Sequence, residues 1–129
     1  MAINTRWDNR DKTTILLEFE TEWSFGDLEA AIQRIDDFIG TVPHPVDVLV
    51  DLEGTKIPKD VMNMAKLLLS NGDARANEGR RIVVGANNAI RQGYHLIHKM
   101  FSNQLKSREI LFADDLSTAR AILGDLRRA

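Results

Sequence analysis

The stretch that most constrains the fold covers residues 46–70 and reads VDVLVDLEGTKIPKDVMNMAKLLLS. It opens with an apolar, largely β-branched run that only Asp47 interrupts, and such a short run is typical of a strand covered on both faces. Residues 51–55 then supply Asp, Glu, Gly and Thr, which favour a turn. Pro58 suits the first turn of a helix, because its missing N–H would have no partner there. The stretch predicts a buried strand at residues 46–51, a tight turn and a helix at residues 58–70.

Two short strands are expected before this stretch. Residues 3–8 form a short edge strand with Trp7 inward, and residues 13–20 alternate between apolar and polar side chains, which predicts a half-exposed strand. The polar turn at residues 9–12 is short enough to join them as an antiparallel hairpin. After the central stretch, the polar residues 71–80 predict a surface loop.

The remainder of the chain alternates helix-like and strand-like segments. Short apolar runs at residues 81–85 and 109–113 predict two more buried strands. Strands that alternate with helices imply right-handed crossovers and a mostly parallel sheet. At 129 residues the length fits one domain over residues 1–129. The expected order is β-β-α-β-α-β-α-β-α, an α/β fold with an N-terminal antiparallel hairpin and helices at residues 24–39, 58–70, about 88–105 and from 116 onward.

Helix ends carry their own signals. Ser24 and Asp27 have the spacing of a capping box, with Asp in the place usually held by Glu. Gly40 is placed to end the same helix in a left-handed conformation. Asp114 or Asp115 is expected to cap the last helix, and Arg127 with Arg128 at its end suits the helix dipole.

Composition excludes several classes of protein and site. The chain has no cysteine, which removes disulfides, thiolate metal sites and thiol nucleophiles. No apolar run approaches membrane-spanning length, and the first residues lack the apolar core of a signal peptide. The net charge of −2 argues against a dedicated nucleic-acid binder. We expect a cytoplasmic protein without membrane insertion.

Charge is unevenly distributed along the chain. Residues 15–40 hold seven acids and one base, whereas residues 74–108 hold seven bases and one acid. Two elements with differently charged solvent faces would explain this pattern. Alternatively, the opposite charges could attract one copy to another, or the basic segment could meet an acidic partner. The pattern is compatible with a homodimer and does not specify one.

No sequence motif identifies a catalysed reaction. VVGANN follows a strand and opens a helix, but it has one glycine where a dinucleotide fingerprint needs three. No serine sits in a G-x-S-x-G elbow. His95 and His98 are three residues apart on a predicted helix, with no third ligand evident. Asp51 ends a strand as a receiver phosphoacceptor does, yet no acidic pair accompanies it. The sequence predicts no catalytic site, no metal and no cofactor.

Four segments together resemble the STAS superfamily of sulfate-transporter and anti-sigma-factor-antagonist domains, and more narrowly its bacterial SpoIIAA-like members. They are TILLEFETEWSFGDLEAA, VLVDLEGTKIP, RIVVGANNAI and ILFADDLSTARAIL. The resemblance implies a single STAS-like domain whose functional surface is the turn and helix after the central strand. In that family a serine or threonine at this helix start is phosphorylated by a partner kinase, and phosphorylation switches binding.

The corresponding segment here, residues 58–61 (PKDV), has no hydroxyl, and Asp60 lies near the phosphoacceptor position. An acid near a helix start is ordinarily a favourable contact with the helix dipole, but a fixed charge there could also imitate the phosphorylated state. The leading hypothesis is a non-enzymatic regulatory or adaptor domain that binds a protein partner. The expected partner-binding residues are Glu53, Thr55, Lys56, Lys59, Asp60, Met62 and Asn63.

Two alternatives remain open. The helix at residues 58–70 is apolar around much of its circumference and rich in methionine, so it could wall a site for a small apolar or lipid-like ligand with Tyr94 or Phe101. The candidate ligand-binding residues are Asn87, Asn88 and Tyr94. An enzyme that uses loop residues such as Asn87, Asn88 and His95 is the weaker alternative.

Overall fold

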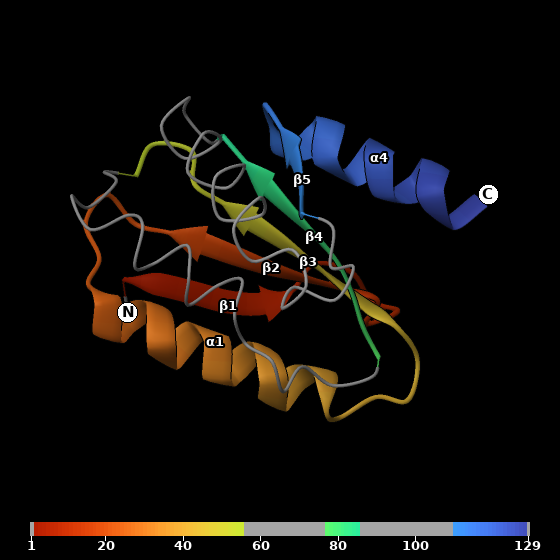
Figure 1. Ribbon diagram of the computed structural model, residues 1–129, viewed down its shortest axis with the longest axis horizontal. Coiled ribbons are helices and arrows are strands. Elements are labelled where there is room, and N and C mark those ends of the chain that lie inside the picture. The colour runs from red at the N-terminus through yellow and green to blue at the C-terminus, as the bar shows by residue number, and fades with distance from the viewer. Residues whose placement is uncertain (1, 56–76, 86–109, 129) are drawn as a thin grey trace, which may run out of the picture.

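The computed structural model describes residues 2–55, 77–85 and 110–128 (Figure 1). Within these ranges the chain forms a five-stranded mixed sheet and two helices, which confirms the α/β class. The helices predicted at residues 58–70 and 88–105 lie outside the described residues. The strands are β1 (Ile3–Trp7), β2 (Thr14–Phe19), β3 (Val46–Asp51), β4 (Glu78–Val84) and β5 (Ile110–Ala113).

The strands lie in the sheet in the order β1-β2-β3-β4-β5, with β1 antiparallel to β2 and all the others parallel. The central strand spans Val46–Asp51 as predicted, and β1 forms an edge of the sheet. Leu49 pairs with Leu16 of β2 on one side and with Ile82 of β4 on the other. Ile82 in turn pairs with Leu111 of β5, so the three apolar runs predicted at residues 46–51, 81–85 and 109–113 form neighbouring strands.

The two helices cover opposite faces of this sheet. α1 (Phe25–Ile39) packs beside β1, and α4 (Leu116–Arg128) follows β5 (Figure 1). On the face covered by α1, the core is formed by Ile15, Leu17, Phe19, Val46, Val48 and Val50 with Leu28, Ala31, Ile35 and Ile39 of the helix. On the face covered by α4, it is formed by Leu16, Leu49, Ile82, Val84 and Ala113 with Ala119 and Leu123.

Coverage of both faces corrects one expectation. Residues 13–20 were predicted to be a half-exposed strand, but Thr14 is 3% exposed and Leu16 is fully buried. Leu16 packs in the cluster under α4, while its neighbours Ile15 and Leu17 pack under α1. Residues 78–80, predicted to lie in a surface loop, form the start of β4 instead. Glu78 pairs with Val46 ahead of a shift in register, and this extends the strand beyond its apolar core.

The ends of α1 show one confirmed prediction and one wrong one. The Ser24 hydroxyl accepts the Asp27 N–H at 3.2 Å, and the Asp27 carboxylate accepts the Ser24 N–H at 2.9 Å, so the capping box is present. Gly40 is right-handed, with φ −67° and ψ −15°. A left-handed glycine is not needed there, because Thr41 donates its N–H to the Phe38 carbonyl and the Asn77 amide donates to the Ile39 carbonyl.

Replacing Ser24 with alanine should lower the free energy of unfolding by about 1 kcal/mol, because the substitution leaves the Asp27 N–H without its cap. Urea denaturation followed by circular dichroism measures the loss. Ser117→Ala, at an exposed position in α4, is the matched control and should change the free energy by less than about 0.5 kcal/mol. Equal effects of the two substitutions would contradict a role for the cap.

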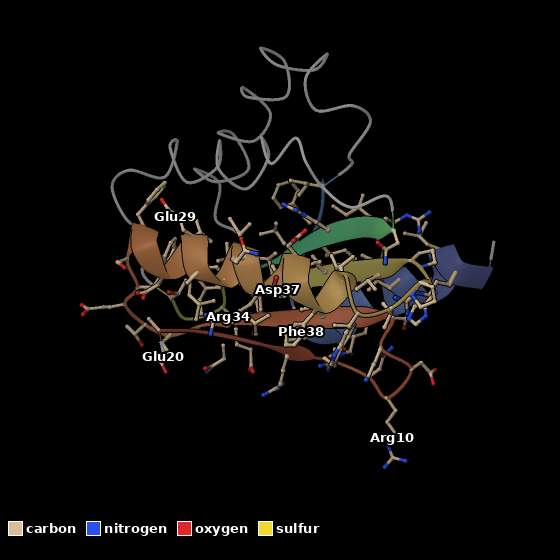
Figure 2. All side chains as sticks on the ribbon, turned by 90° about the horizontal axis from the view of Figure 1, so that it is seen from below. Arg10, Glu20, Glu29, Arg34, Asp37 and Phe38 are labelled. Carbon is tan, nitrogen blue, oxygen red and sulfur yellow. The ribbon has the colours of Figure 1, made fainter. Side chains whose placement is uncertain are left out.

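α1 also covers part of the outer edge of β1. Arg34 Nη2 donates to the Ile3 carbonyl oxygen at 3.3 Å, and the Phe38 ring lies 5.5 Å from the Trp7 ring, measured between centroids. Figure 2 shows Arg34 and Phe38 between the helix and the strands. An edge strand that a helix and a charged side chain cover is a poor template for pairing with another chain.

α4 begins after Asp115, whose carboxylate accepts the Thr118 N–H at 2.7 Å. That hydrogen bond is the main reason why the pKa of Asp115 lies below its ordinary value. Asp115, rather than Asp114, is therefore the residue that caps this helix through its side chain. Among the helices in the described ranges, none has the length and apolar character needed to cross a bilayer.

Candidate functional site

The candidate site lies where β2, β3 and β4 end. Because these strands are parallel, their carboxyl ends meet at one edge of the sheet, which is the usual place for binding sites in α/β folds. The turn after β3 is tied to β4, since the Leu52 N–H donates to the Val84 carbonyl at 2.9 Å. It closes on itself through the Thr55 N–H, which donates to the Leu52 carbonyl at 3.2 Å. We call residues 19–22 and 52–55 together the corner.

Two glycines allow this turn to pack tightly. Gly54 has φ +75° and Gly85 has φ +74°, conformations that other residues rarely adopt. A Cβ on Gly85 would lie 2.8 Å from Glu53 Cγ and 3.1 Å from the Glu53 nitrogen. The Glu53 N–H donates to the Asp51 carboxylate at 3.0 Å, so the backbone at Glu53 is fixed from both sides.

Thr55 joins the turn to the end of β2. Its hydroxyl donates to the Glu20 carbonyl and is also within 3.3 Å of the Thr21 carbonyl. On the other side of this connection, the Phe19 and Trp23 rings meet edge to face with centroids 4.9 Å apart. Thr55 was predicted to belong to a partner-binding surface, and in the structure its hydroxyl helps to hold the corner together.

The corner contains an open groove with an acidic lining. Its described lining residues are Phe19, Glu20, Thr21, Glu22, Glu53 and Gly54. The three glutamates are exposed, and Phe25, at the first turn of α1, is the large apolar side chain that is most exposed in the described part of the chain, at 38%. A groove with fixed backbone and several carboxylates can attract a cationic group.

Sequence reasoning found part of this site. Glu53 and Thr55 were predicted as binding residues and both lie in the corner. The other predicted residues lie outside the described residues: Lys56, Lys59, Asp60, Met62 and Asn63 for a partner, and Asn87, Asn88 and Tyr94 for a ligand.

Glu20, Thr21 and Glu22 were not predicted, although they line the same groove. The signal that could have found them is topological: a strand ending at about residue 20 beside a parallel strand ending at residue 51 brings both ends to one edge of the sheet. Within the described ranges, no group of three or more histidine or acidic side chains is arranged to hold a metal ion.

The structure also shows which side chains of the two charged segments are exposed. Of the acids in residues 15–40, Asp27 is used in the cap and Glu18 pairs with Arg6 at 2.8 Å, whereas Glu29 and Asp37 are exposed on α1 (Figure 2). In the basic segment, Arg81 is only 9% exposed. The acidic segment therefore forms an exposed surface over α1 and the corner, while at least one of the bases belongs to the interior.

Comparison of the chain with protein-family models, with curated proteins and with solved structures found no match.

Proposed function

We propose that this chain is a non-enzymatic regulatory or adaptor domain that binds a protein partner at the corner. The observation that carries the proposal is the acidic groove. Glu20, Glu22 and Glu53 line it, and the turn that contains Glu53 is held by backbone hydrogen bonds. Carboxylates carried by a hydrogen-bonded backbone favour a partner segment with lysine or arginine side chains, because complementary charge steers encounter and selects partners.

The position of the groove also supports the proposal. It lies directly after the central strand, which is where the resemblance to STAS and SpoIIAA-like domains places their partner-binding surface. We therefore extend the proposal to a STAS-like domain acting in the cytoplasm, without the family's phosphoacceptor hydroxyl at residues 58–61. A second copy is one candidate partner, because residues 74–108 hold six bases besides the buried Arg81 and only one acid.

Reversing the charges of the groove tests the proposal. The variant Glu20→Lys, Glu22→Lys, Glu53→Lys should lose its partner in a pull-down quantified by mass spectrometry, because a basic segment would now be repelled. The control Glu29→Lys, Asp37→Lys, Asp125→Lys makes the same change in net charge at exposed positions of α1 and α4. It should retain the partner.

The two variants separate a specific surface from general attraction. Thermal unfolding should show similar midpoints for both, since all six positions are exposed. Equal loss of capture by both variants would mean that overall charge, and not the corner, is responsible. Full capture by the corner variant would reject this surface.

A further inference from the structure

At the opposite end of the sheet from the corner, a second cavity lies between α4 and the β1–β2 turn. Its volume is about 290 Å³, and the described residues that line it are Asp8, Asn9, Thr14, Arg120, Leu123 and Arg127. Ligand pockets for small molecules begin at about 300 Å³, so the space suits a small molecule rather than a protein segment.

Both arginines are held in place by carboxylates. Arg120 donates from Nε and Nη2 to the two oxygens of Asp8, at 3.0 and 2.7 Å. Arg127 Nη2 lies 2.8 Å from Asp47 Oδ2, 2.8 Å from the Thr14 hydroxyl and 3.0 Å from the Thr13 carbonyl. The hydrogen bonds to Asp8 also raise the pKa of Arg120 above its ordinary value, so its guanidinium stays charged.

The carboxylates are recessed and the guanidinium groups face solvent. The side chains of Asp8 and Asp47 are 11% and 9% exposed, whereas those of Arg120 and Arg127 are 51% and 37% exposed. A guanidinium has five N–H donors, and Arg120 uses only Nε–H and one hydrogen of Nη2 on Asp8. For Arg127, every acceptor in the described part of the chain is contacted through Nη2. Within the described residues, each fork therefore keeps N–H groups for an incoming acceptor.

We propose that this cavity binds the phosphate group of a small phosphorylated molecule. Preorganised arginine forks are the side chains best matched to phosphate oxygens, and here two of them line one cavity. The Thr14 hydroxyl and the Asn9 amide add polar contacts, and Leu123 supplies an apolar wall for the rest of the molecule. This site is separate from the corner and does not depend on the function proposed there.

Titration of the isotopically labelled full chain, followed by NMR of the backbone amides and the arginine side chains, tests the site. The probes are inorganic phosphate and pyrophosphate, with chloride at matched ionic strength as the reference. We expect saturable shifts at Asp8, Asn9, Thr14 and Arg120 with either phosphate probe. Absence of saturation with both probes, or the same shifts with chloride, would overturn the proposal.

Three variants, studied by the same titration, test the roles of Arg120 and Asp8 in phosphate binding. Arg120→Lys keeps the charge and one contact to Asp8 but loses the fork, and it should weaken phosphate binding about tenfold. Asp8→Asn removes the recessed negative charge and should tighten binding, an outcome that a purely structural pair would not give. Arg6→Gln removes a cation that pairs with Glu18 outside the cavity, and it should leave binding within about twofold. Equal weakening by Arg6→Gln and Arg120→Lys would reject the site in favour of general attraction.

The same assay separates a small molecule from a phosphorylated protein. Free phosphoserine should bind more tightly than phosphoserine within a short neutral peptide, because the cavity is small and α4 forms one of its walls. Tighter binding of the peptide would overturn the assignment to a small molecule.

Discussion

Replacing Gly79 with alanine should lower the free energy of unfolding by about 3 kcal/mol, because the added methyl has no space. A Cβ at this position would lie 2.2 Å from Asp47 Oδ1 and 3.0 Å from the Val46 carbonyl oxygen. Asp47 cannot retreat without breaking its bonds to the Arg80 N–H at 2.7 Å and to Arg127 at 2.8 Å. The substitution therefore combines steric overlap with the loss of hydrogen bonds to a buried carboxylate.

Gly124→Ala is the matched control for this prediction. Gly124 lies within α4, and nothing lies within 4 Å of the position that its Cβ would take. Alanine should stabilise the helix there by about 0.5–1 kcal/mol. Urea unfolding followed by tryptophan fluorescence measures both changes. Destabilisation of similar size by the two substitutions would show that Asp47 does not fix the position of Gly79.

Replacing Leu49 with alanine should lower the free energy of unfolding by about 3–4 kcal/mol. Leu49 is fully buried between Leu16 and Ile82 in the middle of the sheet, and α4 covers it through Ala119 and Leu123. The loss combines the transfer energy of the removed methyl groups with the cavity that a central strand cannot fill by moving.

Leu52→Ala makes the same chemical change at a half-buried position just after β3. It should cost about 1 kcal/mol, since less apolar surface is lost. Measured by the same unfolding experiment, a cost for Leu49→Ala no larger than that for Leu52→Ala would contradict the central position of β3.

The parts of the fold that the sequence predicted are those with local signals. The β-branched run at residues 46–51 identified a strand covered on both faces, because no polar side chain alternates along it apart from Asp47. Ser24 and Asp27, three residues apart, predicted where α1 begins and how it is capped. Each of these signals is contained within one element, so no knowledge of distant contacts was needed.

Asp47 shows why other features could not be predicted. In the sequence it is only an interruption of an apolar run, and a charged residue is seldom buried without a partner. Its partners are Arg127, 80 residues away, and the backbone of Arg80. Arg127 was predicted only to suit the helix dipole, because a helix end is a local signal and the approach of α4 to β3 is not.

The residues of the corner were also predicted only in part. Glu53 and Thr55 follow a recognisable strand and were predicted, whereas Glu20 and Glu22 join them only because β2 lies next to β3. Their charges were noted in the sequence as part of an acidic segment. Strand order, which the sequence left open, is what turns that segment into one wall of a groove.

The contacts of α4 have a consequence for synthesis of the protein. Arg120 bonds to Asp8, 112 residues earlier, and Leu123 covers a face of the sheet that includes Leu16. On a translating ribosome, the contacts of Leu16, Leu49 and Ile82 with Ala119 and Leu123 can form only after α4 has left the exit tunnel. Among the described elements, the apolar layer between α4 and the sheet is therefore the last to form during synthesis.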